Sequence, residues 1–152
     1  MGKRPLILAG QHECVIDAKN RVSIPSKLRD QLDPEMDGQG YFVVLESELI
    51  LSIYPDRYFQ RLVEQRPSSL THSEDRRTFD RVRFGLSSPT EPDKQGRILL
   101  PEWLIRRAKL GKKVILTGAG DHMELWDQPR WEAFVEQNLP RLGEITSRVL
   151  DS

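Results

Sequence analysis

The sequence predicts an α+β fold of two tandem, pseudo-two-fold-related β units, with helices that connect and flank them. A motif that begins at Asp17 returns at Asp93, so that Asp, Arg, Pro and Leu recur at a constant offset of 76 residues in a chain of 152. β-prone runs surround each copy's turn, and segments with helical spacing follow it. Two copies are too few for a solenoid, which needs about three stacked units. We therefore expect each half to supply surface that the other lacks.

Each copy of the motif predicts a hairpin with a three-residue turn. In the first copy, residues 18–20 separate β-prone runs at 15–16 and 21–24. Hairpin loops of this length favour a left-handed last residue, usually Gly or Asn. The two copies place Asn20 and Gly96 at that position.

Opposite charges close the mouth of each predicted hairpin. Asp17 faces Arg21 in the first copy, and Asp93 faces Arg97 in the second. Such a pair across a hairpin contributes roughly 0.2–1 kcal/mol. We expect both pairs to help hold the hairpins in shape.

A proline ends the second strand of each hairpin and opens a short helix. Pro25 and Pro101 suit the first turn of a helix, where the missing N–H group costs nothing. Residues 26–32 and 102–108 continue at helical spacing. Each half therefore begins as strand, tight turn, strand and short helix.

Both halves then continue with two strands and helices. In the first half we expect a turn-rich loop at 33–40, strands at 41–45 and 49–54, and helices at 55–66 and 73–84. In the second half we expect strands at 113–117 and 123–126, and helices at 128–139 and 141–150. The aromatic residues of these segments are expected in the core, namely Tyr54, Phe59, Trp126 and Trp131. Because proline cannot donate a ladder hydrogen bond, Pro89 and Pro92 predict a short or edge strand before the second motif.

The composition is that of one ordinary globular domain. No apolar stretch approaches the ~20 residues of a membrane span, and the N-terminus lacks the pattern of a signal peptide. A single cysteine, Cys14, excludes an intrachain disulfide. We therefore expect a cytoplasmic protein that does not bind membranes.

The charge is unevenly distributed although the net charge is zero. Residues 93–113 hold seven Lys/Arg against two Asp/Glu, and residues 1–33 hold six against four. Residues 114–152 hold three Lys/Arg against seven Asp/Glu. Both hairpin units are therefore positive. A positive patch can meet phosphates on a neutral protein, although an ordinary solvated surface gives the same pattern.

The two hairpins resemble those of a known family. Paired D-x-x-x-R turns, each followed by apolar-x-apolar-Pro and a short helix, resemble the MraZ family of bacterial transcriptional regulators. Each half is similar to the AbrB-type swapped-hairpin DNA-binding domain. Residues 114–118 (VILTG) and 123–127 (MELWD), with Trp131 beyond, add to the resemblance, which covers nearly the whole chain.

The resemblance implies a domain organisation and a function. It implies AbrB-like repeats at 7–54 and 86–129, connecting helices at 55–85 and C-terminal helices at 130–152. The implied function is sequence-specific regulation of transcription by a ring-like homo-oligomer. Its implied partner is double-stranded DNA, as promoter direct repeats in a cell-division and cell-wall gene cluster that includes its own promoter. This function implies association with the nucleoid.

In swapped-hairpin regulators, the arginine that closes the turn and the basic residues of the next helix meet DNA. The resemblance carries this role to Arg21, Arg29, Arg97 and Arg106. Lys19, Lys27, Lys94 and Arg107 are added because they lie on the same turns or helices. The structural residues of the motif are Asp17, Asn20, Pro25, Asp93, Gly96 and Pro101. Arg29 corresponds to Ile105, so the two halves are not chemically equivalent.

The sequence leaves alternatives open. Arg21 and Arg97 either clamp their hairpins or contact DNA, and both roles coexist if the aspartate orients the guanidinium. The whole chain is alternatively a protein-interaction module, antitoxin-like or a scaffold, with residues 139–152 as the binding segment. We expect no enzyme, no cofactor, no metal site and no small-molecule substrate, because no constellation of nucleophiles or metal ligands is complete.

Overall fold

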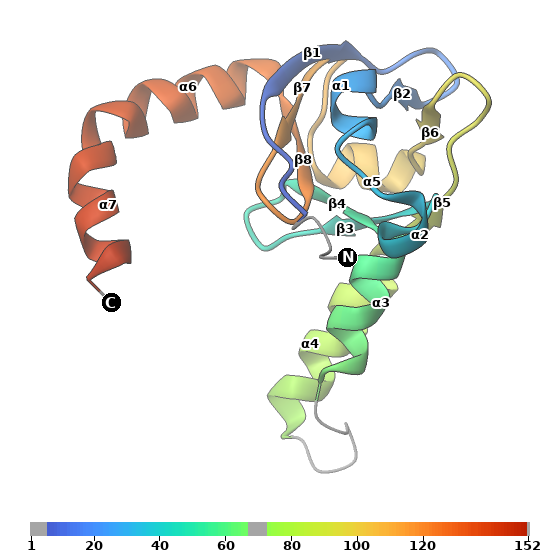
Figure 1. The fold of residues 1–152 in the computed structure, drawn as a ribbon, viewed down its shortest axis with the longest axis horizontal. Coiled ribbons are helices and arrows are strands. Elements are labelled where there is room, and N and C mark those ends of the chain that lie inside the picture. Colours follow the sequence, from blue (N-terminus) through green and yellow to red (C-terminus); the bar gives the residue numbers. More distant parts are fainter. Residues whose placement is uncertain (1–5, 67–72, 152) are drawn as a thin grey trace.

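The computed structural model describes residues 6–66 and 73–151. It contains a six-stranded antiparallel sheet and a two-stranded ribbon, surrounded by helices (Figure 1). The strands are β1 (Gln11–Val15), β2 (Arg21–Ser23), β3 (Tyr41–Leu45), β4 (Leu51–Pro55), β5 (Ser87–Thr90), β6 (Arg97–Leu99), β7 (Lys113–Gly118) and β8 (Met123–Asp127). The helices are α1 (Ser26–Arg29), α2 (Pro34–Asp37), α3 (Asp56–Glu64), α4 (Glu74–Gly85), α5 (Glu102–Arg107), α6 (Gln128–Asn138), the 3-10 helix η2 (Leu139–Arg141) and α7 (Leu142–Leu150).

The strand order is pseudo-two-fold symmetric. The sheet runs β1-β7-β8-β4-β3-β5, and the ribbon pairs β2 with β6. The counterparts of β1, β2, β3 and β4 are β5, β6, β7 and β8. If each strand is exchanged for its counterpart, the sheet reads β5-β3-β4-β8-β7-β1, which is the original order in reverse. In the ribbon, Val22 lies opposite its own counterpart, Ile98. This arrangement confirms the predicted α+β fold of two related units.

The hairpins of the two halves are interlocked. The strands that flank each turn pair with the other half, because β1 pairs with β7 and β2 pairs with β6. Beyond the ribbon, the Ile24 N–H donates to the Gly96 carbonyl at 2.9 Å, and the Leu100 N–H donates to the Asn20 carbonyl at 2.8 Å. Each turn therefore lies beside the end of the opposite hairpin.

The turns have the predicted conformation. Asn20 has φ of +62° and Gly96 has φ of +78°. The N–H of each residue donates at 3.0 Å to the carbonyl of the aspartate that begins its turn. The three-residue turns inferred from residue type are confirmed.

The core lies between one face of the sheet and the ribbon with its two short helices. α1 and α5 each bury one leucine completely, Leu28 and Leu104. Burying such a side chain is worth roughly 1.5–3 kcal/mol, which anchors helices too short to be stable alone. The other members of this cluster include Val22, Ile98, Leu51, Ile53, Val114, Leu116, Met123 and Leu125.

The opposite face of the sheet is covered only in part. Phe59 of α3 packs with Val44 and Tyr54 in a second cluster, which Phe84 of α4 borders. Trp126, on β8, lies beneath α6 and is buried. Helices α3 and α4 project together from the sheet, and α6 leads to an extended arm that ends in α7 (Figure 1).

Some boundaries differ from the predictions. The turn-rich loop contains α2, whose cap is Asp33 and whose first residue is Pro34. Strand β4 begins at Leu51 because the preceding turn continues through Leu49, which has φ of +63°. The strand with Pro89 is β5, at one edge of the sheet as predicted. Within the described residues, no helix is long and apolar enough to cross a membrane.

Candidate nucleic-acid interface

An aspartate organises each hairpin turn. Asp17 Oδ1 accepts from the N–H groups of Lys19 and Arg21, both at 2.9 Å, and Oδ2 accepts from Arg21 Nε at 2.9 Å. Asp93 repeats this pattern at 2.8–3.0 Å with Gln95 and Arg97. The arginine N–H group is the largest cause that lowers the pKa of each carboxyl group. Both aspartates therefore stay ionised and hold turn and guanidinium together.

The clamp leaves part of each arginine available. Arg21 and Arg97 use only Nε to reach their aspartates. Among the residues that the structure describes, none forms a hydrogen bond with the Nη atoms of either side chain, and these side chains are 27% and 28% exposed. The geometry is thus compatible with clamping and DNA contact by the same residue.

The ribbon presents the two arginines on one face. In the ladder, Arg21 lies opposite Leu99, and Ser23 lies opposite Arg97. Because Val22 and Ile98 point into the core, these four residues point outward. Leu99, which is 57% exposed, was not among the predicted site residues. The sequence does contain an indication of its exposure. Leu99 occupies the position of Ser23 in the second motif, and it lies two residues after Arg97, so both side chains are expected on the same face of the strand.

Arg29 of the first half lies on the turn of the second half. Its Nε donates to the Ile24 carbonyl at 2.9 Å. A Cβ atom on Gly96 would come within 3.0 Å of Arg29 Cζ. The structure thus places Arg29 next to the turn that carries Lys94 and Arg97. Lys27, Lys19 and Lys94 are exposed on α1 and on the two turns.

The basic residues of α5 do not all gather at the turns. Arg106 and Arg107 are exposed near the C-terminus of this helix. Arg107 lines a separate groove of about 340 Å³, formed with Phe79 and Val82 of α4 and with the β3–β4 turn. The eight candidate residues therefore divide into those on the two turns and α1, and those on α5.

This surface offers mainly hydrogen-bond donors. Among residues 6–66 and 73–151, no three His, Cys, Asp or Glu side chains are close enough together to hold a metal ion. Guanidinium groups match phosphate oxygens and guanine edges with two parallel hydrogen bonds. The DNA major groove, about 12 Å wide, admits a two-stranded ribbon. The chemistry of this face suits a duplex.

Comparison with known proteins shows a family match along the chain. The model of the MraZ protein family, described as antitoxin-like, matches residues 7–82 and again 84–151. A protein of Heliobacterium modesticaldum is 32% identical over 142 residues, which cover 93% of this chain and 96% of the relative. A relative from Pediococcus pentosaceus is 34% identical over 143 residues, which cover 93% of this chain and 96% of the relative. A relative from Kineococcus radiotolerans is 36% identical over 142 residues, which cover 93% of this chain and 95% of the relative. All three are named transcriptional regulator MraZ.

Proposed function

Because the chain belongs to the MraZ family, we propose that it is a sequence-specific DNA-binding regulator of transcription. The observation that carries the proposal is the shared outward face of the ribbon, where Arg21 and Arg97 keep their Nη atoms unbonded within the described residues. Residues 7–54 and 86–129 would be its two DNA-binding units.

The proposed contacts divide by chemistry. The turn lysines, Lys19 and Lys94, supply mobile positive charge to phosphates, which fixes the position of the protein on the duplex. Arg21 and Arg97 have oriented guanidinium groups, which suit base edges in the major groove. Arg29 extends the same surface from α1.

Assembly would provide the affinity that one subunit lacks. We propose a ring-like homo-oligomer that binds direct repeats in promoter DNA of a cell-division and cell-wall gene cluster, including its own promoter. Linking weak sites whose spacing matches the DNA raises avidity by roughly 10²–10⁴. Such binding would place the protein on the nucleoid. A stable monomer in light scattering that still binds promoter DNA tightly would count against the ring.

Fluorescence anisotropy with the duplex upstream of the gene tests the proposal. We expect affinity to fall with salt, with a logarithmic slope of about −0.9 for each phosphate neutralised. Arg21→Ala and Arg97→Ala should each weaken specific binding by about 1–3 kcal/mol. The matched control is Arg148→Ala on α7, whose side chain is 61% exposed and pairs with Glu144; it should bind like the wild type. Equal binding to a scrambled duplex would refute sequence specificity.

A protein-interaction module is the second candidate, because α7 exposes apolar residues. Leu142, Val149 and Leu150 are 54–77% exposed on this helix. Charge reversal at Arg21 and Arg29 distinguishes the two functions. If promoter binding is unchanged in that variant, the interaction module is favoured.

A further inference from the structure

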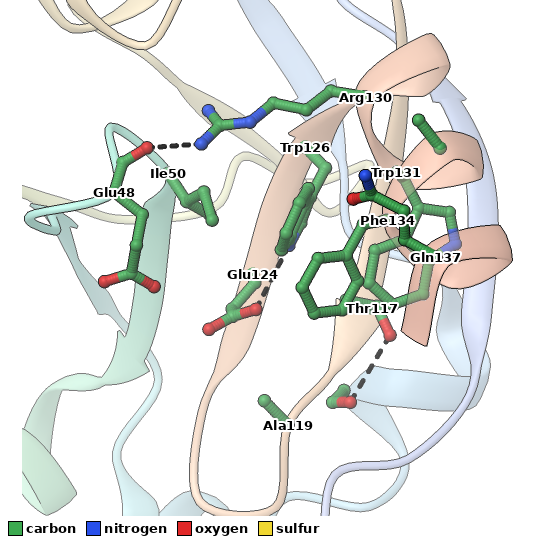
Figure 2. A pocket seen from close by; sticks show the side chains of 12 residues that line it. Glu48, Ile50, Thr117, Ala119, Glu124, Trp126, Arg130, Trp131, Phe134 and Gln137 are labelled. Atoms are coloured by element: carbon green, nitrogen blue, oxygen red, sulfur yellow. Dashed lines mark hydrogen bonds between the residues drawn. The ribbon is translucent and has the colours of Figure 1, made fainter. Parts of the chain in front are cut away.

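A cleft of about 530 Å³ lies between α6 and the outer face of the sheet (Figure 2). Its floor is formed by β7 and β8 with Thr117, Glu124 and Trp126. One wall is α6, and Glu48 of the β3–β4 turn lines the other side. A volume of this size suits a small molecule.

Aromatic rings make much of the cleft. Trp126 lies 5.2 Å from Trp131 and 4.8 Å from Phe134, measured between ring centroids. Phe134 is 43% exposed, and Trp131 is only partly buried, whereas Tyr54, Phe59 and Trp126 are buried as predicted. The incomplete burial of two rings leaves aromatic surface open to a ligand.

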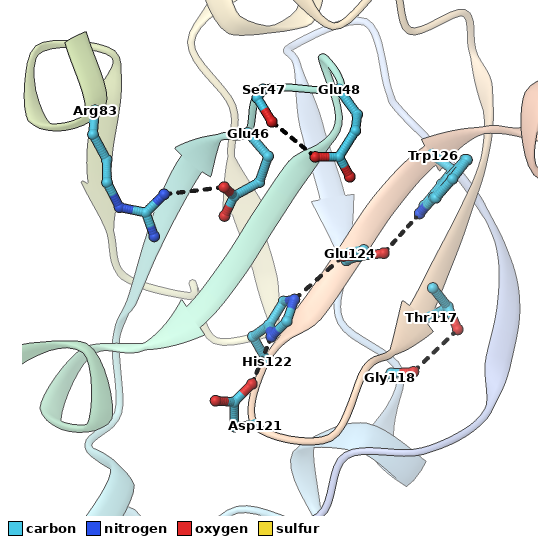
Figure 3. Close-up of polar contacts among 10 residues, drawn as sticks. All are labelled: Glu46, Ser47, Glu48, Arg83, Thr117, Gly118, Asp121, His122, Glu124 and Trp126. Carbon is cyan, nitrogen blue, oxygen red and sulfur yellow. Dashed lines mark hydrogen bonds and ion pairs between the residues drawn. The ribbon is translucent and has the colours of Figure 1, made fainter. Parts of the chain in front are cut away.

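An ionised carboxylate lies at the base of the cleft. Glu124 Oε1 accepts from Trp126 Nε1 at 3.1 Å, and Oε2 lies 3.3 Å from His122 Nε2 (Figure 3). The hydrogen bond with His122 is the largest cause that lowers the pKa of Glu124. These contacts fix a negative group beside the rings.

A second carboxylate lines the cleft without a cationic partner. Glu48 Oε1 accepts from the Ser47 hydroxyl at 3.0 Å (Figure 3). Within the described part of the chain, no Lys, Arg or His forms an ion pair with Glu48. The carboxylates of Glu48 and Glu124 exceed the single guanidinium of Arg130 in the lining, so the cleft carries a net negative charge that favours a cationic ligand.

The protein itself already places a cation on this aromatic surface. The guanidinium carbon of Arg130 lies 5.4 Å from the centroid of Trp126. Its Nη1 donates to the Leu49 carbonyl at 3.2 Å, and Nη2 donates to the Glu48 carbonyl. Arg130 is thus held at one end, while Glu124 and Phe134 line the rest of the cleft (Figure 2).

We propose that this cleft binds a small organic cation, an alkylammonium or guanidinium group on a short aliphatic stem. The charged group would pair with Glu124 and lie against the face of Phe134, since aromatic rings attract cations. The stem would pack on Trp131 and Ile50. This ligand site goes beyond the proposed DNA binding and does not depend on it.

Isothermal titration calorimetry with agmatine tests the proposal on the full chain. Agmatine carries a guanidinium and an amine on a four-carbon stem, and N-butylurea is its uncharged control. We expect saturable 1:1 binding of agmatine and no binding of N-butylurea. Glu124→Gln keeps the shape and the acceptor for Trp126 but removes the charge, and should weaken binding by at least about tenfold.

Two further variants locate the site. Phe134→Leu should weaken agmatine binding several-fold, whereas Phe79→Leu, an exposed aromatic of α4 outside the cleft, should leave it unchanged. Circular dichroism checks that each variant is folded. The proposal is overturned if agmatine does not bind, or if Glu124→Gln binds it as the wild type does. It is also overturned if Glu124→Gln lowers the oligomer mass in light scattering while agmatine affinity stays the same, because the cleft would then be a contact between copies.

Discussion

Asn20 and Gly96 occupy the same position in the two turns but have different neighbours. Their positive φ values follow from local turn chemistry, which is why residue type predicted them. The contact of Arg29 with Gly96 depends on the crossing of the two hairpins, so no local pattern indicated it. Leu99 differs from Arg29, because strand alternation alone places it on the same face as Arg97, and its exposure could have been predicted.

Gly96→Ala should destabilise the protein. An alanine with φ near +78° costs about 1–2 kcal/mol, and its Cβ would press on the Arg29 guanidinium. Urea unfolding measures the loss. Gly143→Ala is the matched control, because nothing lies within 4 Å of a Cβ there and alanine favours α7. An unchanged stability of Gly96→Ala would contradict this account of the turn.

His122 should make stability depend on pH. Burial lowers the pKa of His122, but the hydrogen bonds that its ring donates to Glu124 and Asp121 outweigh this effect and raise the pKa above 6.5. The stabilisation is therefore complete below pH 6.5 and is lost as the pH rises through the raised pKa. We expect the free energy of unfolding to fall over this range in the wild type.

His122→Gln provides the comparison, because glutamine cannot gain a charge. The difference in unfolding free energy between the two proteins should shrink as the pH rises. If both lose stability in parallel between about pH 6 and about pH 9, His122 is not the group responsible.

Helix α2 formed within a segment that was predicted to be a loop. Residues 33–40 are dominated by Asp, Pro and Gly, which favoured a loop. An aspartate followed by proline is equally the start of a helix, and Asp33 Oδ1 accepts from the Glu35 N–H at 3.0 Å. The longer helices were predicted closely because their apolar residues recur at helical spacing, as in α3 and α6.

Asp33→Ala should lower stability by about 1 kcal/mol, the usual cost of removing an N-cap. The loss is measured as a shift of the urea midpoint at constant slope. Asp30→Ala is the control, because Asp30 is exposed at the end of α1 and its side chain makes no hydrogen bond in the described structure. Equal shifts in both variants would mean that the cap does not stabilise α2.

The molecule as a whole depends on pairing between its halves. The duplicated motif predicted two related units, but the choice of strand partners is a long-range property: β1 pairs with β7, and β3 pairs with β5. The edge position of β5 was predictable because Pro89 cannot donate within a ladder. The cleft beneath α6 was not, because Trp131 has the pattern of a core residue and its partial exposure depends on how α6 packs.

A chain ending at Gly85 should therefore not fold as a monomer. It keeps β1 to β4 but loses β7 as the partner of β1 and β6 as the partner of β2. At low concentration, we expect the circular dichroism spectrum of an unfolded chain. At high concentration, we expect a homodimer in analytical ultracentrifugation, because two copies can supply each other's missing surface. A folded monomer would show that each half is independently stable.

Covalent linkage of the halves lets Arg29 and Ile105 differ at equivalent positions. A dimer of identical chains reads the same in both directions and matches a palindrome. The two halves of this molecule are not equivalent, so under the proposed function it would hold a DNA duplex in one orientation only. Neighbouring subunits of the proposed ring would then bind successive sites along the DNA in the same orientation. Inverting one recognition element would then abolish its occupancy, although its base composition stays the same.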